Sequence, residues 1–549
     1  MSKTVMEDVT GSKRKRPSDG IPTGDKSRKA PKVSASENMQ SQILLLEEQI
    51  VTSPKHYENI TTLHNLVTNA EKKPKAATVA AVALCRTFCR LIAGEKLAKK
   101  TGASQPEVKT IQWLRSALRE YVGVVAGWIG SPDAAKENTA LTLLMRVAKE
   151  EASVGGEQSW RGGSSTFVTV VRALLREDNA ESAREEFVDR YVEEHDDVRF
   201  FTFAAIKQLL QGTDQCEQYV GNAVALLSQI ENVPESEDQL DNWYAEAPAA
   251  GKHQLRALSA HRKAAREAWL AVFRSPLSQE HRKVIVNIIT RQILPWFTGQ
   301  VELLTDFLTD SFNSGGAMSL LALSGIFHLM TEKNLDYPDF YTKLYSLLDE
   351  DVLHSKYRSR FFRLLHTFMN SSHLPAAMVA SFIKRLSRFA LQAPPGAIVW
   401  IVPWVYNTLK QHPPCTFMLH RSYHPAHAIY ASNPNYKEEG MDDSFDMSQT
   451  DPMLTGAIDS SLWELETLQS HFHPNVATLA KIMGEQFTKR DYQLEDFLDH
   501  SYGSLIEAEL GKAMKKTPVV EWDIPKRIVT TDGGLNDIGM LLQSALDCA

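Results

Sequence analysis

The stretch HSKYRSRFFRLLHTFMNSSHLPAAMVASFIKRL, residues 354–386, decides the fold because its apolar residues repeat at helical spacing. The first segment places on one side of a helix Tyr357, Phe361, Leu364, Leu365 and Phe368. The SSHLP motif then ends that helix, since proline suits the first turn of the next one. The second helix extends a few residues beyond the quoted stretch. Its residues expected to face inward are Val379, Phe382, Ile383, Leu386 and Ala390. The pattern therefore predicts two antiparallel helices with buried aromatic side chains.

The basic residues of the same stretch are expected on the outer faces of these two helices. Together they would form a ridge that consists of Arg358, Arg360, Arg363, Lys384, Arg385 and Arg388. Two interpretations remain open. The ridge is either a solvated face whose long side chains cover apolar neighbours, or a surface that contacts RNA phosphates or an acidic partner.

Helical spacing continues through most of the 549 residues, and no sustained alternation of period two occurs. Helices of ordinary length separated by short breaks predict an all-α protein built as a HEAT-like helical repeat, an α-solenoid. We expect an N-terminal helical-repeat region at 39–295 and a second helical domain at 296–510, with a mobile acidic loop at about 428–456. The extended C-terminal tail, 511–549, is predicted to lie as a strap across another protein around Trp522 to Ile528.

Residues 1–38 are predicted to be a disordered basic tail, because they are poor in large apolar residues and rich in Ser, Pro, Gly, Lys and Arg. Residues 1–36 hold 9 basic and 4 acidic side chains, so their net charge is 9 − 4 = +5. The whole chain has a net charge of −7, which leaves −12 for the rest. Two clusters in the tail have the layout of a bipartite nuclear import signal: Lys13, Arg14, Lys15 and Arg16, then Lys26, Arg28, Lys29 and Lys32.

Five irregularly spaced cysteines indicate a reducing compartment. Cys85 and Cys89, four residues apart in an amphipathic run, are expected to be buried as small hydrophobic residues. We expect no membrane-spanning segment, because no apolar stretch looks long enough to cross a bilayer, and no secretory signal.

Catalytic and cofactor motifs are missing from the sequence, so neither an enzyme nor a cofactor is expected. The Gly-rich stretch GGEQSWRGG, residues 155–163, lacks the lysine and the preceding strand of a phosphate-binding loop. The residues Asp349, Glu350 and Asp351 are typical of a solvated helix end. Zinc-ligand types do gather in one segment, at His412, Cys415, His420, His424 and His427. Prolines interrupt that segment, so we interpret these residues as part of a surface loop and expect no metal.

Four segments carry a family resemblance: NLDYPDFYTKLYSLLDEDVLHSKYRSRFFRLL, LPAAMVASFIKRLSRFAL, APPGAIVWIVPWVYNTLKQHP and DPMLTGAIDSSLWELETLQSHFHPNVATLAKI. From about Ser319 to Leu498 the chain resembles the CCAAT-binding-factor (CBF) domain, more narrowly its nucleolar complex protein four branch. The resemblance implies a non-enzymatic, HEAT-like scaffold for ribosome biogenesis and rRNA processing in the nucleus and nucleolus. It also implies a complex with nucleolar protein fourteen and other proteins of the small-subunit processome. Contact with pre-ribosomal RNA or small nucleolar RNA would be direct or through those proteins.

Two other functions fit a helical repeat with a nuclear tail. One is a nuclear transport receptor, which suits the acidic body but not an import signal on the same chain. The other is a transcription cofactor. The location within the cell separates the three functions. A protein in the nucleolus would support the assembly scaffold. A protein at the nuclear rim would support the transport receptor, and a nucleoplasmic protein would support the transcription cofactor.

Overall fold

The computed structural model describes residues 35–69, 74–98, 105–156, 158–212, 217–248, 253–333, 337, 339–421, 435–440, 442–512, 541 and 544–547. Within these ranges the regular structure is helical and no strand occurs. The all-α prediction is therefore confirmed. The chain forms two compact units, Met1–Leu303 and Leu304–Ala549. Their division lies a few residues beyond the predicted boundary between 295 and 296.

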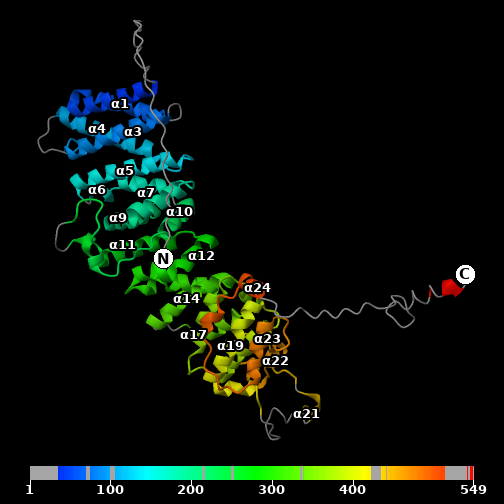
Figure 1. The fold of residues 1–549 in the computed structure, drawn as a ribbon. Coiled ribbons are helices and arrows are strands. Elements are labelled where there is room, and N and C mark those ends of the chain that lie inside the picture. Colours follow the sequence, from blue (N-terminus) through cyan, green and yellow to red (C-terminus); the bar gives the residue numbers. More distant parts are fainter. Residues whose placement is uncertain are drawn as a thin grey trace, which may run out of the picture. The chain divides into compact units, whose positions relative to one another are not determined.

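Unit 1 is a stack of helices, in which each contacts its neighbours (Figure 1). Its helices are α1 (Ala35–Thr52), α2 (Glu58–Thr68), α3 (Pro74–Ala93), α4 (Gln105–Ala126), α5 (Ala134–Gly155), α6 (Gln158–Arg161), α7 (Thr166–Arg176), α8 (Glu181–Phe187), α9 (Asp196–Leu210), α10 (Glu217–Leu227), α11 (Leu258–Arg274) and α12 (Gln279–Ile288). The odd-numbered helices α3, α5, α7, α9 and α11 pack in succession. Because the larger contacts of each described helix are with its neighbours in the stack, unit 1 is a helical repeat, as predicted.

Local sequence explains where these helices begin. The Asp133 side chain accepts a hydrogen bond from the backbone N–H of Ala135 and caps α5. Ser165 caps α7 in the same way, accepting from the N–H of Val168. Shorter helical turns lie between these helices and after α12. The 3-10 turns are at Pro54–His56, Glu237–Gln239, Gln254–Arg256, Leu294–Phe297 and Val301–Leu304, and the π turns are at Val188–Val192 and Ile289–Ile293.

Helix α3 corrects one expectation. It has 20 residues and a mean hydropathy of 1.6, so by length and composition alone it could cross a membrane. The helix instead lies inside the stack, packed against α1, α2 and α5. Its small residues, which include Ala80, Ala81 and the buried Cys85, allow those neighbours to approach closely. The prediction that no apolar stretch is long enough was wrong, because a central solenoid helix is apolar on several sides.

Unit 2 is built around one buried helix. Its helices are α13 (Thr305–Asn313), α14 (Gly316–Lys333), α15 (Phe340–Ser346), α16 (Glu350–His354), α17 (Arg358–Met369), α18 (Ala376–Ala390), α19 (Pro395–Gln411), α21 (Tyr436–Glu439), α22 (Trp463–Leu468), α23 (Pro474–Ala480) and α24 (Tyr502–Leu510). Further 3-10 turns lie at Pro413–Met418, Ala457–Asp459, Lys481–Gly484 and Leu494–Phe497. Helix α19 is buried on all sides, and α18, α23 and α24 pack against it. The ring of Trp400 in α19 stacks on Phe362 of α17 at 4.0 Å between centroids.

The two helices predicted from residues 354–386 are α17 and α18. The predicted inward residues of α18 are all buried, and so are Phe361, Leu365 and Phe368 of α17. Tyr357 and Leu364 are only partly covered. The apolar pattern therefore located both helices and most of their core contacts correctly.

Part of the predicted acidic loop lies along α18. We call residues 442–461 the strap. The Ser381 hydroxyl of α18 lies 2.5 Å from the Pro452 carbonyl oxygen and 2.5 Å from the Thr455 hydroxyl, and all three residues are in the described part of the chain. These contacts fix the strap to the helix, although its sequence suggested a mobile insertion.

Candidate partner-binding surfaces

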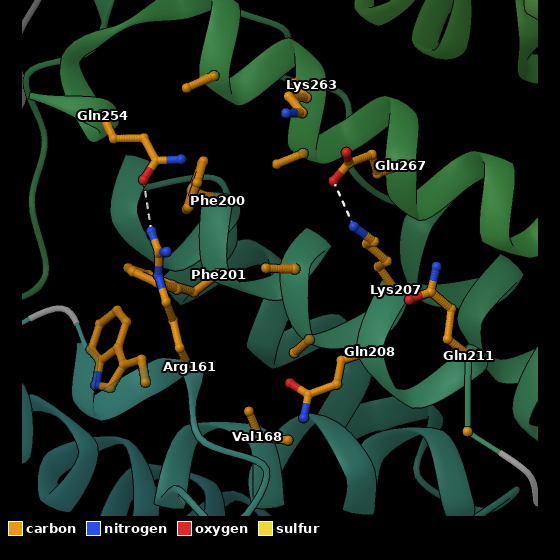
Figure 2. Close-up of a pocket in the computed structure, with 16 residues that line it drawn as sticks. Arg161, Val168, Phe200, Phe201, Lys207, Gln208, Gln211, Gln254, Lys263 and Glu267 are labelled. Atoms are coloured by element: carbon orange, nitrogen blue, oxygen red, sulfur yellow. Dashed lines mark hydrogen bonds and ion pairs between the residues drawn. The ribbon is translucent and has the colours of Figure 1, made fainter.

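A groove in unit 1 is formed by α6, α7, α9, the Gln254–Arg256 turn and α11 (Figure 2). It encloses about 580 Å³. Alanines occupy the facing positions of α9 and α11 in this groove: Ala204, Ala205, Ala260 and Ala264. Their short side chains leave space between two helices that otherwise pack together. Aromatic rings of Trp160, Phe200 and Phe201 complete the apolar lining.

The rim of the groove is polar. The Arg161 guanidinium donates a hydrogen bond of 2.8 Å to the Gln254 side-chain oxygen and lies 5.8 Å from the centre of the Phe201 ring. Across the groove, Lys207 Nζ lies 2.9 Å from a carboxylate oxygen of Glu267 (Figure 2). Three further rim side chains have no hydrogen-bond or ion-pair partner in the described ranges: Lys263, Gln208 and Gln211. The groove therefore has donors available to a ligand.

Positive charge exceeds negative charge at this groove. The residues that line the groove include three basic side chains, Arg161, Lys207 and Lys263, and one acidic side chain, Glu267, so their net charge is 3 − 1 = +2. Helix α11 as a whole carries four basic side chains and one acidic one, so 4 − 1 = +3. The rest of the chain outside the N-terminal tail is acidic, so the groove is a local exception.

The predicted basic ridge of unit 2 is wrong in one central respect. Lys384 does not face outward, because its side chain is 0 % exposed. Its Nζ lies 2.8 Å from a carboxylate oxygen of Glu464, which is also 0 % exposed, and 3.0 Å from a carboxylate oxygen of Asp443. It also donates a hydrogen bond of 2.5 Å to the carbonyl oxygen of Ser461. Lys384 is thus a packing element that joins α18 to the strap and α22.

The neighbouring arginines of α18 take part in the same arrangement. Arg388 Nε lies 2.8 Å from Glu464, and its terminal nitrogen lies 2.6 Å from Asp443. Arg385 donates a 2.7 Å hydrogen bond to the carbonyl oxygen of Leu348. Burial by itself raises the pKa of Asp443, but hydrogen bonds from its neighbours outweigh this effect and lower that pKa to about 2. The carboxylate therefore stays charged beside the basic side chains.

The three arginines of α17 also have partners within unit 2. Arg358 donates to the carbonyl oxygens of Leu353 and His500 at 3.1 and 3.0 Å, and burial lowers its pKa. Arg360 bonds to the Ser324 hydroxyl. Arg363 forms an ion pair with Glu495 at 2.8 Å, with side chains 50 % and 66 % exposed. Of these three, Arg363 is the one most open to an external partner.

Three of the residues considered as metal ligands have structural roles, and two of them, His412 and Cys415, are buried rather than part of a surface loop. Asp349 caps α16 by accepting a hydrogen bond from the Val352 N–H. His412 bonds to the Met369 carbonyl oxygen at 2.9 Å, and the Cys415 thiol donates to the Ala376 carbonyl oxygen at 3.5 Å. In the described part of the chain no group of three or more His, Cys, Asp or Glu side chains could hold a metal ion. His424 and His427 lie outside that part.

Two other groups of predicted residues lie outside the described residues. They are the import clusters at 13–16 and 26–32, and the tail segment around Trp522 to Ile528. Their roles stay predictions.

Known proteins resemble both units of the chain. Residues 32–215 match the family described as "Nucleolar complex protein 4-like, TPR repeats", and residues 319–480 match the CBF/Mak21 family. An uncharacterised protein of Schizosaccharomyces pombe is 38 % identical over 491 residues, which cover 87 % of this chain and 96 % of that protein. Nucleolar complex protein 4 of Saccharomyces cerevisiae is 39 % identical over 368 residues, 64 % of this chain and 65 % of that protein. The human homolog of that protein is 33 % identical over 423 residues, which cover 75 % of this chain and 79 % of the human protein.

The chain belongs to the nucleolar complex protein 4 family. The family resemblance drawn from the four segments is therefore confirmed, and so are the nucleolus as its location and ribosome biogenesis as its field of action. The family name mentions TPR repeats, whereas the sequence predicted HEAT-like ones. Both are stacks of antiparallel helix pairs, so the solenoid prediction agrees with it. Family membership points to a scaffold whose function is binding.

Sequence reasoning missed the groove of this nucleolar complex protein 4 relative. Arg161 lies in the Gly-rich stretch 155–163, which was considered only as a phosphate-binding loop. Four of its residues, Gln158–Arg161, instead form a short helix, α6, at the groove rim. A usable signal was present in α11, where basic residues follow one another in the motif AHRKAARE.

Proposed function

We propose that the chain is a non-enzymatic scaffold in small ribosomal subunit biogenesis. It acts in the small-subunit processome, as a complex with nucleolar protein fourteen, and supports maturation of pre-ribosomal RNA. The observation that carries this proposal is the similarity to nucleolar complex protein 4 relatives across both units. A helical repeat suits this work, because its stacked layers expose long surfaces while the core stays intact.

Contact with RNA in this proposal runs mainly through partner proteins. All six basic residues of the predicted ridge have partners within unit 2. The chain outside its N-terminal tail carries a net charge of −12, which repels phosphate backbones. Arg363, half exposed, and the tail around Trp522 to Ile528 are the proposed contacts with partner proteins.

Affinity purification of the tagged chain, followed by sedimentation and sequencing of associated RNA, tests the function. We expect nucleolar protein fourteen among the partners and small-subunit precursors in the same fractions. Sedimentation with large-subunit precursors alone would contradict the proposal. Deletion of 515–549 should weaken recovery of the partner; undiminished recovery would remove the tail from the contact.

A further inference from the structure

We propose that the groove between α9 and α11 binds an extended segment of a partner protein that carries carboxylate side chains between apolar ones. The inference takes its biological meaning from the proposed scaffold function, but it concerns a site that can be tested by itself. Four features carry it: a positioned guanidinium, a floor of small side chains and, within the described ranges, an ammonium group and two side-chain amides without a partner.

Arg161 is held in a position suited to a carboxylate. One terminal nitrogen donates to Gln254, and the guanidinium lies against the Phe201 ring. A guanidinium has five N–H donors, and no other hydrogen bond from Arg161 occurs within the described ranges. The remaining donors can form the paired bonds that arginine makes with carboxylates. Because the side chain is already oriented, little conformational entropy is lost when a ligand binds.

Lys263 supplies a second positive charge. Its ammonium group is exposed on α11 and has no partner in the described part of the chain. Lys207, in contrast, is already paired with Glu267. A ligand therefore meets two cations whose charge is not balanced within the groove, Arg161 and Lys263.

The floor and the amides suit an extended main chain. Ala204, Ala205, Ala260 and Ala264 allow a polypeptide backbone to approach the helices closely. Gln208 of α9 and Gln211, which directly follows α9, are exposed, and each amide has both donor and acceptor atoms that match peptide groups. The rings of Trp160, Phe200 and Phe201 line the groove although they are largely buried, and they form its apolar base, on which apolar side chains of the segment would lie. Figure 2 shows Arg161 and Gln254 on one side of the groove, with Lys207 and Glu267 on the other.

A protein segment fits this groove better than RNA does. A single-stranded RNA would bring a negative charge with every nucleotide close to a body whose net charge is −12. A segment with one or two carboxylates places negative charge only where Arg161 and Lys263 lie. RNA binding is kept as an outcome of the test.

Fluorescence anisotropy with the full chain tests the proposal. The probes are fluorescein-labelled peptides of about ten residues, which extend to roughly 33 Å. They share one apolar frame, and two central positions carry glutamate, glutamine or lysine. We expect the glutamate peptide to bind at least about tenfold more tightly than the glutamine peptide, with an affinity that falls as salt rises.

The decisive variant is the double charge reversal Arg161→Glu with Lys263→Glu. It should abolish the preference for glutamate and transfer it to the lysine peptide. Lys283→Glu on α12 is the matched control, since Lys283 is also an exposed cation of unit 1. Arg161→Lys keeps the positive charge but loses the planar guanidinium that can form two parallel hydrogen bonds with a carboxylate. It should therefore reduce the affinity for the glutamate peptide without reversing the preference for glutamate. Circular dichroism melting curves check that every variant is folded.

Three results would overturn the inference. They are equal affinity for all three peptides, a glutamate preference that survives the double reversal, and a single-stranded RNA probe that binds with the same dependence on Arg161 and Lys263. Failure of the scaffold function looks different. In that case the peptide preference persists, but the protein is missing from ribosome precursors.

Discussion

Replacing Lys384 with methionine removes the buried charge that joins α18 to the strap. Methionine has nearly the same length and an apolar end, so the change tests the charge and leaves the packing volume similar. Glu464 then keeps Arg388 as its ionic partner, and the Ser461 carbonyl oxygen loses its bond to Nζ. We expect this substitution to destabilise unit 2 strongly.

The structure sets the size of the effect. Breaking a buried ion pair by removing one partner costs about 3–5 kcal/mol, because the other charge stays buried without compensation. Arg388 also reaches Glu464, but its side chain is 34 % exposed and only partly offsets the loss. The expected value is therefore near the lower end, about 3 kcal/mol. For a domain of this size that corresponds to a fall in melting temperature of roughly 6–12 °C.

Thermal unfolding of the full chain, followed by circular dichroism and by calorimetry to resolve the two units, measures the effect. Lys489→Ala is the control, because Lys489 pairs with Glu485 at the surface, with side chains 48 % and 57 % exposed. That pair should contribute little to stability, because both side chains are exposed to solvent. A double variant, Lys384→Met with Glu464→Gln, should recover a large part of the stability, since no uncompensated carboxylate then remains.

A loss below about 1 kcal/mol in Lys384→Met would refute the reasoning, because a value that small belongs to exposed pairs. The same holds if the double variant is less stable than the single one. Either result would mean that Nζ reaches water in solution and that the strap leaves α18.

The remaining predictions concern pH and the arginines of α17. Burial lowers the pKa of His261 to about 4, so the unfolded state binds an extra proton between pH 6.5 and 4 and stability falls as the pH falls. His261→Asn should flatten that slope in denaturant titrations across pH. Glu151 behaves oppositely, since burial raises its pKa to about 7 and stability is lost as the pH rises from about 4.5 through 7. Glu151→Gln should therefore stabilise the protein by about 1–3 kcal/mol at pH 8 and leave it nearly unchanged at pH 4, as urea unfolding would show. Arg358→Ala should cost about 1–3 kcal/mol, because it leaves the His500 carbonyl oxygen without this donor. Arg363→Ala should cost less than about 1 kcal/mol and weaken partner recovery instead; equal melting temperatures for the two variants would contradict this difference.

Helices α17 and α18 could be predicted because burial follows a local rule. Residues such as Phe361 and Leu365 recur every three or four positions, and that spacing alone selects the face that leaves water. The break at Pro375 was equally local. No knowledge of the rest of the chain was needed for either result.

The surroundings of Lys384 could not be predicted in the same way. Its position on α18 faces the core, and a basic residue there is stable only if a carboxylate arrives from elsewhere. Glu464 lies 80 residues further along the chain. Helical periodicity within residues 354–386 contains no information about which distant segment packs on that face. The acidic composition of the loop was visible in the sequence, but it led to the expectation of a mobile segment.

The same difficulty applies to any ridge inferred from charge alone. A cation is available to a partner only when the fold has not already supplied it with a carboxylate or a carbonyl oxygen. In unit 2 the fold supplies such partners to every residue of the predicted ridge, including Arg363 at the surface. Among the described residues of unit 1 it leaves Lys263 unpaired and Arg161 with unused donors beside a floor of alanines. Partner recognition in this chain is therefore better sought where charge remains unbalanced than where basic residues are most frequent in the sequence.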